Sequence, residues 1–250
     1  MGLTDQLPGR PNQKVIVALD VDNRIKAMEL VTNLASELNW FKVGMELFSA
    51  EGPQIVREIS DAGAKVFVDL KFHDIPNTVA RASAAITRLG AAMLNVHCGG
   101  GKEMMQRAVE AVREAAAQER IPVPKLIGVT VLTSMSQTVL TGEAGVNREL
   151  KEHVQALALL AKEAGLDGVV ASPQEVEMIR AACGPEFIAV TPGVRPVWAA
   201  LNDQKRVTTP AEALRLGSTY LVIGRPITGA PDPKAACRKI LQEMSNNDDK

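Results

Sequence analysis

Short apolar runs recur along this chain at regular intervals, and each is followed by a segment with the apolar spacing of an amphipathic helix. Runs that are apolar throughout are typical of strands buried on both faces of a parallel sheet. Strands that alternate with helices are joined by right-handed crossovers into such a sheet. The pattern therefore predicts an α/β fold.

The predicted strands are Val15–Leu19, Trp40–Gly44, Lys65–Val68, Ala92–His97, Lys125–Val131, Asp167–Ala171, Phe187–Thr191 and Tyr220–Gly224. The predicted helices are Asn23–Leu38, Gly52–Ala62, Asn77–Leu89, Lys102–Glu119, Glu149–Ala164, Pro173–Ala182, Ala211–Leu216 and Pro233–Met244. Eight strand–helix units in 250 residues match a closed (β/α)8 barrel, the TIM barrel, in size. A doubly wound open sheet is the alternative, because closure cannot be read from one sequence.

No linker, composition break or repeat interrupts the series, so we expect one (β/α)8 barrel domain over residues 15–244. Residues 1–14 are expected to form a polar N-terminal extension, and residues 245–250 a polar tail that frays. The extension contains Pro8 and Pro11 and lacks the apolar core of a signal peptide. No run approaches the roughly 18 apolar residues of a membrane span.

The composition excludes several classes of partner. A net charge of -1 gives no reason to expect nucleic acid or an anionic membrane. The three cysteines, Cys98, Cys183 and Cys237, are far apart and form no Cys-x-x-Cys pair, which favours reduced thiols in a cytoplasmic protein. No His-x-x-x-His pair or facial triad suggests a metal site.

Three charges of alternating sign follow the third predicted strand. They are Asp69, Lys71 and Asp74. Alternation along a strand would point Asp69 and Lys71 to the same side, with Asp74 just beyond in the loop. Burying such ions costs several kcal/mol each unless they pair or meet a ligand, so the stretch is either a solvated turn or a functional site.

Polar side chains also follow the other predicted strands. The strand ends carry Asp20, Lys42, Asp69 with Lys71, His97, Thr133 with Ser134, Ser172, Arg195 and Arg225. In a (β/α)8 barrel these ends meet at the face that carries active sites. Loops are polar in general, but unlike charges that converge on one rim favour a functional site.

The last two loops indicate a phosphorylated substrate. Phosphate sites of these barrels often form after strands seven and eight. Here the two loops supply Gly193 with Arg195, and Gly224 with Arg225. Glycine allows close backbone approach, and arginine can bind a phosphate with two N–H groups.

Lys71 suits proton donation better than nucleophilic attack, because nearby carboxylates favour the charged form of its amine. An adjacent Asp would repel an anionic carboxylate on a substrate by about 4 kcal/mol at ~4 Å and an effective dielectric near 20. Loss of CO2 would remove this repulsion and leave a carbanion beside Lys71. Stabilisation of that carbanion explains rate acceleration better than repulsion of the substrate carboxylate does.

The chain closely resembles the orotidine 5′-phosphate decarboxylase family over Val15–Ile227. The resemblance rests on Asp69-Leu70-Lys71-Phe72-His73-Asp74-Ile75-Pro76-Asn77-Thr78, Leu132-Thr133-Ser134-Met135, Thr191-Pro192-Gly193-Val194-Arg195-Pro196, Asp203-Gln204-Lys205-Arg206 and Val222-Ile223-Gly224-Arg225-Pro226-Ile227. It implies decarboxylation of orotidine 5′-phosphate to UMP without a metal or organic cofactor. Cys98 departs from the family, where a small residue such as Ala is usual.

The resemblance also implies roles for single residues. Lys71 would donate a proton to C6 of the substrate's pyrimidine ring. It would belong to a charge network with Lys42, Asp69 and Asp74. Asp20 and Lys42 would bind the ribose, Ser134 with Thr133 the pyrimidine, Gln204 both base and phosphate, and Gly224, Arg225 and Arg195 the phosphate end. A homodimer would bring Asp74 and Thr78 into the partner's site, and a loop from Thr191 to about Arg206 would close over the ligand.

Two alternatives stay open. Magnesium-dependent sugar-phosphate enzymes (3-keto-gulonate-phosphate decarboxylase and hexulose-phosphate synthase) share the Asp-x-Lys-x-x-Asp element, although the His73–Thr78 continuation and the Gln204 loop point away from them. A non-catalytic nucleotide-binding barrel would bind UMP without turnover, although the intact charges argue against it.

Overall fold

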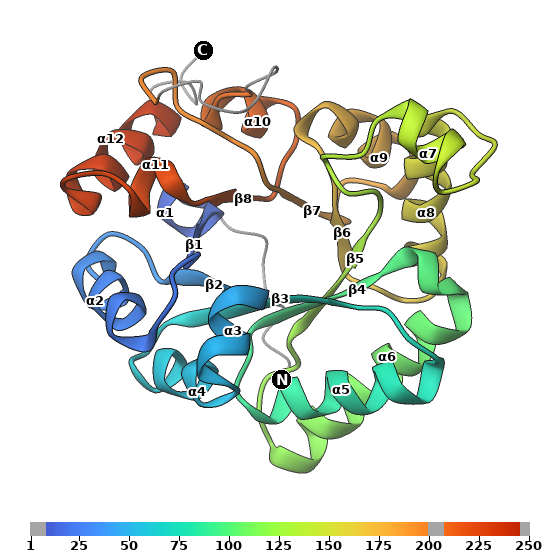
Figure 1. Cartoon of the computed structure of the whole chain (residues 1–250), viewed down its shortest axis with the longest axis horizontal. Coiled ribbons are helices and arrows are strands. Elements are labelled where there is room, and N and C mark those ends of the chain that lie inside the picture. Colours follow the sequence, from blue (N-terminus) through green and yellow to red (C-terminus); the bar gives the residue numbers. More distant parts are fainter. Residues whose placement is uncertain (1–8, 200–207, 246–250) are drawn as a thin grey trace.

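Eight parallel strands close into a barrel in the order β1-β2-β3-β4-β5-β6-β7-β8, with helices around the outside (Figure 1). The computed structural model describes residues 9–199 and 208–245. The pairing of β1 with β8 closes the barrel, with Val15 opposite Leu221 and Val17 opposite Ile223. The predicted (β/α)8 barrel is thus confirmed, and the open sheet is excluded.

The strands are β1 (Val15–Ala18), β2 (Trp40–Gly44), β3 (Lys65–Phe72), β4 (Met93–His97), β5 (Lys125–Val129), β6 (Gly168–Val170), β7 (Ile188–Thr191) and β8 (Tyr220–Ile223). The α-helices are α1 (Pro11–Lys14), α2 (Arg24–Leu34), α3 (Met45–Glu51), α4 (Gln54–Asp61), α5 (Pro76–Arg88), α6 (Gly101–Glu119), α7 (Gln137–Gly142), α8 (Leu150–Glu163), α9 (Val176–Cys183), α10 (Pro210–Arg215), α11 (Arg225–Thr228) and α12 (Pro233–Ser245). Two 3-10 turns, η1 (Cys98–Gly100) and η2 (Pro173–Glu175), precede α6 and α9.

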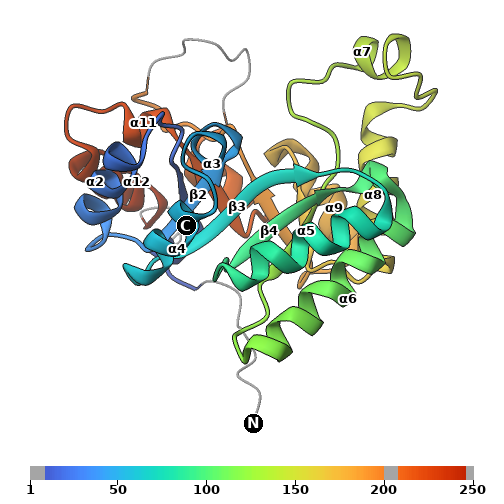
Figure 2. The same cartoon turned by 60° about the horizontal axis from the view of Figure 1, so that its bottom comes forward.

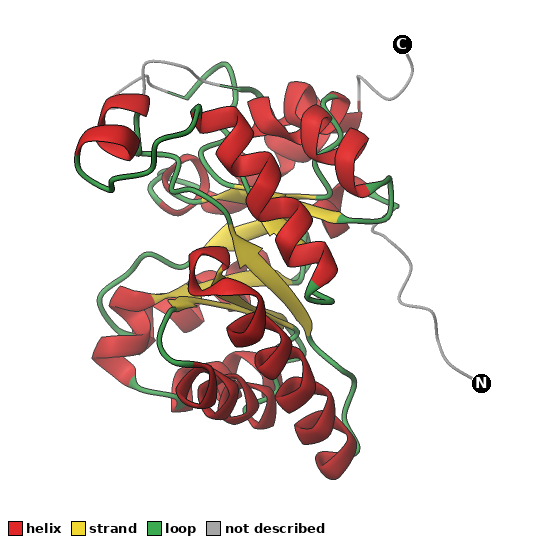
Figure 3. Ribbon diagram, turned by 90° about the vertical axis from the view of Figure 1, so that its right-hand side faces the viewer, coloured by secondary structure: helices red, strands yellow, loops and turns green. Residues whose placement is uncertain are grey.

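Buried side chains form two layers, one inside the barrel and one between strands and helices, which flank the strands on both sides in Figure 3. Ile16 and Ala18 of β1 point into the barrel, whereas Val15, Val17 and Leu19 pack against the helices. This two-sided burial explains why the strands are apolar throughout. The inner layer consists of Ile16, Ala18, Trp40, Phe67, Met93, Ile127, Ile188, Val190, Tyr220 and Val222.

Several element boundaries differ from the sequence predictions. The first long helix ends at Leu34 rather than Leu38, and the fifth strand ends at Val129 rather than Val131. The third strand continues to Phe72, so the charged stretch begins inside it. The helices α1, α3, α7 and α11 were not predicted, because each is at most seven residues long, too short to show a helical period.

The carboxyl ends of the strands define one face of the molecule. Helix α3 follows β2 directly, and α11 follows β8 after a single residue. Figure 2 places α3, α7 and α11 toward the same end of the barrel. Within the ranges 9–199 and 208–245, no helix is both long and apolar enough to cross a bilayer.

Candidate active site

Asp69 and Lys71 form a close ion pair at the carboxyl end of β3. The Lys71 ammonium nitrogen lies 2.6 Å from Asp69 Oδ1. The Asp69 side chain is only 14% exposed and that of Lys71 25% exposed. The pair is therefore largely withdrawn from water, where its interaction is screened less than on a surface.

Lys42 of β2 extends this pair into a chain of alternating charges. Its ammonium nitrogen lies 3.5 Å from Asp69 Oδ2 and 3.0 Å from Oδ1 of Asp20, which follows β1. We call Asp20, Lys42, Asp69 and Lys71 the charge array. Three consecutive strands thus bring together four residues that were predicted at the rim from the sequence.

The charge array keeps Asp69 ionised. Burial alone would raise the pKa of the Asp69 carboxyl group, but Lys42 and Lys71 and the hydrogen bonds from Lys71 and Asn95 outweigh it. The net effect is a pKa below the ordinary value of an aspartate. A fixed negative charge consequently lies between two ammonium groups at neutral pH.

Two residues that the sequence analysis overlooked shape the array. Asn95 of β4, buried with 1% exposure, donates to Asp69 Oδ1 over 2.7 Å and accepts from the Lys71 backbone N–H over 2.8 Å. Gly44 leaves room for Lys42, because a Cβ there would lie 2.9 Å from the ammonium nitrogen. An asparagine inside an otherwise apolar strand was the available signal for Asn95; nothing in the sequence marked Gly44.

The end of β8 borders the array from the other side. A Cβ on Gly224 would lie 3.5 Å from Asp20 Oδ2 and 3.4 Å from the Ala18 Cβ. Gly224 precedes the short helix α11, which begins at Arg225. Arg225 is exposed, and Arg195, which follows β7, is buried with 8% exposure. The glycine, a short helix and two arginines therefore lie in the loops where such barrels often bind phosphate.

Other predicted site residues lie outside the array. Asp74 and Thr78 are exposed, and Asp74 Oδ1 accepts the Ile75 backbone N–H over 2.6 Å. Thr133 and Ser134 occupy an exposed turn after β5. Gln204 lies outside the described residues. Among the described residues, the hydrogen bonds and ion pairs of the array do not include Asp74, Thr78, Thr133 or Ser134.

Two histidines pack beside the array. The rings of His73 and His97 are 5.4 Å apart between centroids and tilted by 35°. Burial, together with the nearby charges of His73 and Lys71, lowers the pKa of His97, which Asp69 opposes. His97 is thus biased toward the neutral form.

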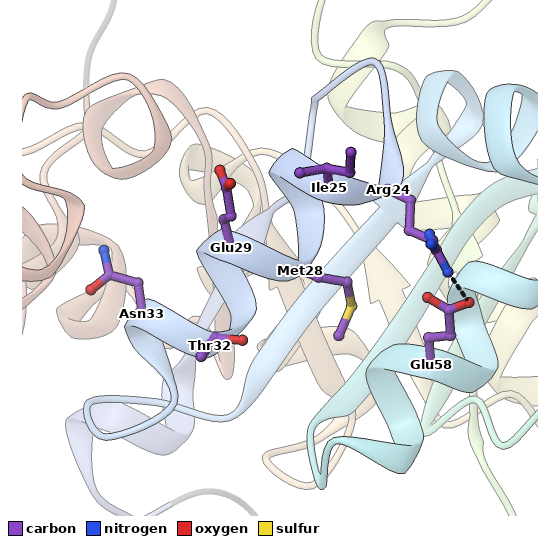
Figure 4. A pocket seen from close by; sticks show the side chains of 7 residues that line it. All are labelled: Arg24, Ile25, Met28, Glu29, Thr32, Asn33 and Glu58. Carbon is purple, nitrogen blue, oxygen red and sulfur yellow. Dashed lines mark hydrogen bonds and ion pairs between the residues drawn. The ribbon is translucent and has the colours of Figure 1, made fainter.

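The surface groove in Figure 4 is a separate feature of the outer wall. It has a volume of about 620 Å³ and is lined by side chains of α2 and by Glu58 of α4. Arg24 and Glu58 form an ion pair of 2.9 Å across it. None of the residues of the charge array lines this groove, so it is not the site described above.

The family model for "Orotidine 5'-phosphate decarboxylase / HUMPS family" matches residues 13–240. The chain belongs to this family. A curated relative from Moorella thermoacetica, named orotidine 5′-phosphate decarboxylase, is 56% identical over 244 residues, which cover 98% of this chain and 97% of that protein. A second relative of the same name, from Syntrophomonas wolfei, is 54% identical over 93% of this chain and 98% of its own length.

Two solved structures share the barrel. An orotidine 5′-phosphate decarboxylase from Lactobacillus acidophilus has a TM-score of 0.82 and 39% identity, covering 93% of this chain and 99% of that chain. An uncharacterized conserved protein from Geobacillus kaustophilus has a TM-score of 0.81 and 40% identity, over 92% of this chain and 99% of that chain. The fold of the orotidine 5′-phosphate decarboxylase / HUMPS family therefore extends over nearly the whole chain.

Proposed function

We propose that this protein decarboxylates orotidine 5′-phosphate to UMP in pyrimidine biosynthesis, in the cytoplasm, and that Lys71 supplies the proton. The observation that carries the proposal is the Asp20–Lys42–Asp69–Lys71 array at the catalytic face of the barrel. Relatives more than half identical over nearly the full chain bear the name orotidine 5′-phosphate decarboxylase.

In the proposed reaction the bond between C6 and the carboxylate carbon breaks, CO2 leaves, and the electron pair stays on C6. Lys71 then transfers a proton from its ammonium nitrogen to C6. The 2.6 Å contact with Asp69 holds that nitrogen in place before the reaction. Two ammonium groups beside the forming carbanion provide preorganised electrostatic stabilisation, which is often the largest catalytic effect.

Substrate binding is assigned to the residues around the array. Asp20 and Lys42 would bind the ribose, while Gly224, Arg225 and Arg195 would bind the phosphate. Gly224 lies close to Asp20, which supports a phosphate site next to the ribose site. Thr133 and Ser134 would contact the pyrimidine, and Gln204 would reach base and phosphate.

We further propose a homodimer in which Asp74 and Thr78 enter the partner's site. Both residues are exposed in the single chain, and Ile75 between them is 67% exposed. A large apolar side chain beside an exposed carboxylate at the catalytic face is consistent with burial against a second copy. Each chain supplies Asp20, Lys42, Asp69 and Lys71 to its own charge network. The partner's Asp74 would complete this network.

We propose that the reaction needs no metal or organic cofactor. A magnesium-dependent sugar-phosphate enzyme of the same family would have to hold its cation with carboxylates such as Asp20 and Asp69. Here the Lys42 ammonium lies between them, 3.0 Å from one and 3.5 Å from the other. A divalent cation in that position would be repelled by Lys42, which favours the metal-free reaction.

The proposal is tested by following the ultraviolet absorbance of orotidine 5′-phosphate with purified protein in excess EDTA, beside Lys71→Ala. Loss of the orotate band with wild type alone is the expected result. UMP binding by calorimetry controls for the fold of the variant. Activity that requires magnesium and a sugar phosphate would assign the protein to the neighbouring enzymes, and UMP binding without turnover would indicate a non-catalytic barrel.

A further inference from the structure

The strand that carries Lys71 is irregular at the catalytic residues. Val68 of β3 pairs with Leu94 of β4, and Phe72 pairs with Val96. Three residues of β3, Asp69–Lys71, therefore lie opposite the single residue Asn95. Such bulges interrupt the backbone ladder and re-aim side chains, and they are frequent beside active sites.

The backbone of Lys71 is also in an unusual conformation. Its φ of 53° lies in the left-handed region, which side chains with a Cβ disfavour. Among the described residues the other non-glycine with positive φ is Arg120, which ends α6, where this conformation is common. A left-handed residue inside a strand persists only where its surroundings hold it.

One side chain spans the irregularity. The Asn95 amide accepts the Lys71 backbone N–H with Oδ1 over 2.8 Å, and donates to Asp69 Oδ1 with Nδ2 over 2.7 Å. The oxygen can only accept and the nitrogen only donates, so the amide fits in one orientation. Burying a polar amide in a barrel strand is unfavourable unless it is hydrogen-bonded, and both Asn95 bonds end on the Asp69–Lys71 pair.

We propose that Asn95 is a positioning residue: one end of its amide holds the Lys71 backbone in the left-handed conformation, and the other end holds the Asp69 carboxylate against the Lys71 ammonium. The inference rests on the proposed decarboxylation, in which these two groups face the reacting carbon. Asn95 is buried with 1% exposure and acts through these two groups.

Two variants separate the two ends of the amide. Asn95→Leu removes both hydrogen bonds at similar volume. Asn95→Asp keeps an acceptor for the Lys71 N–H but replaces the donor to Asp69 with a second carboxyl group. Thr87→Val is the matched control, because Thr87 is fully buried on α5, donates one hydrogen bond to Ser83 O over 2.9 Å, and lies outside the array.

Asn95→Leu is expected to lower kcat at least ~10-fold while KM and UMP affinity change less than ~3-fold, because the lost contacts act at the reacting atom. Thr87→Val should keep kcat within about twofold, which calibrates the loss of one buried hydrogen bond. Unchanged kcat in both Asn95 variants would overturn the inference. A loss of UMP binding parallel to kcat would do so too, since Asn95 would then support the whole site.

The pH dependence of kcat in the two Asn95 variants distinguishes a positioning role from general destabilisation. From about pH 8 to pH 5 the ratio of Asn95→Asp to wild-type kcat should rise as pH falls, because a protonated carboxyl group can again donate to Asp69. The corresponding ratio for Asn95→Leu should not rise. The charged and titratable groups near the substitution, common to all proteins compared, are Asp20, Lys42, Asp69, Lys71, His73 and His97. Equal pH trends for both variants would contradict the proposal.

Crystal structures of the two variants test the inference apart from turnover. The expected result for Asn95→Leu is a Lys71 φ outside the left-handed region or a broken Asp69–Lys71 contact. An unchanged Lys71 backbone together with an unchanged contact would overturn it. If the wild type failed to decarboxylate orotidine 5′-phosphate, the proposed function would fall, while the crystal structures would still decide the role of Asn95.

Discussion

A methyl group on Gly44 would lie 2.9 Å from the ammonium nitrogen of Lys42 and 3.6 Å from Asp20 Oδ1. The absent side chain of Gly44 therefore leaves the space in which Lys42 meets Asp20. Because Lys42 is 11% exposed and also faces Asp69, little other room is open to its ammonium group.

Gly44→Ala should consequently impair catalysis with little loss of stability. The backbone at Gly44 has φ of -91°, which alanine adopts freely, so the free energy of unfolding should change by less than about 1 kcal/mol. Displacing the Lys42 ammonium from the carboxylates should lower kcat about 10- to 100-fold. Initial rates with orotidine 5′-phosphate and thermal unfolding measure both effects.

Gly142→Ala is the matched control, because a Cβ there meets nothing within 4 Å. It should keep the wild-type rate. A Gly44→Ala protein with wild-type kcat would show that Lys42 can shift without consequence.

The barrel was predictable because each strand is buried on both faces and so reads as an apolar run. Gly44 illustrates what was not predictable. It appeared only as the last residue of a strand, and its proximity to Asp20, whose Oδ1 would lie 3.6 Å from a Cβ at this position, depends on how β1 and β2 lie in space. Distances between side chains of different strands cannot be read from local spacing.

Regular strand alternation predicted that Asp69 and Lys71 point to the same side, and in the structure the two side chains form an ion pair. Regular alternation does not explain this geometry, because the pairing of β3 with β4 is irregular between Val68 and Phe72 and Lys71 has a positive φ. A lysine carries no sequence signal for a left-handed backbone, since the conformation is imposed by tertiary contacts. Asn95, which supplies two of these contacts, stood in the sequence merely as a polar residue in an apolar strand.

The proposed dimer predicts complementation between two inactive proteins. Lys71→Ala and Asp74→Ala should each lose activity, but a mixed dimer would contain one site with both groups intact. Random exchange between protomers of a two-fold dimer should restore roughly a quarter of the wild-type activity. The measurement is the rate after co-refolding the two proteins, with each one refolded alone as the control. Mixtures no more active than their components would refute the shared site.

The lowered pKa of His97 should make the free energy of unfolding depend on pH. Its pKa is lowered in the folded protein, mainly by burial and then by His73 and Lys71, from a value of 6.5. As pH falls below about 6.5, the unfolded chain therefore takes up more protons than the folded one, and the free energy of unfolding decreases. His97→Phe keeps a ring beside His73 and should flatten this decrease.

The experiment is chemical denaturation of wild type and His97→Phe between about pH 7.5 and pH 5.5. In His97→Phe the free energy of unfolding should still decrease somewhat as the pH falls, because burial also lowers the pKa of His153. His153→Phe is the matched comparison. Equal slopes in wild type and His97→Phe would mean that His97 titrates alike in both states.

Thiol reactivity should report unfolding rather than any surface site. Cys98, Cys183 and Cys237 are all buried. Burial raises the pKa of the Cys98 thiol to about 12 and that of Cys237 to about 11, with Glu37 adding to the latter. Because the thiolate is the reactive form, a disulfide reagent should label the native protein slowly and all three cysteines rapidly in denaturant. Rapid labelling of one thiol in the native state would contradict this burial.

Cys98, which directly follows β4, and Gly128 of β5 should be energetically coupled. A Cβ on Gly128 would lie 2.5 Å from Cys98 Sγ and 3.0 Å from Leu166 Cδ2, so Gly128→Ala overpacks the core and should lower the free energy of unfolding by about 1–3 kcal/mol. Cys98→Ala removes the sulfur and should itself destabilise by about 1 kcal/mol.

In the double variant the new methyl group occupies part of the volume that the sulfur leaves. The combined loss should therefore fall short of the sum of the two single losses by at least ~0.5 kcal/mol, which denaturant unfolding of the four proteins can resolve. Recovery should stay incomplete, because the contact with Leu166 persists. Strict additivity would mean that the backbone shifts to admit the methyl group without displacing Cys98. An alanine in place of Cys98 would then give no advantage to a larger residue at Gly128.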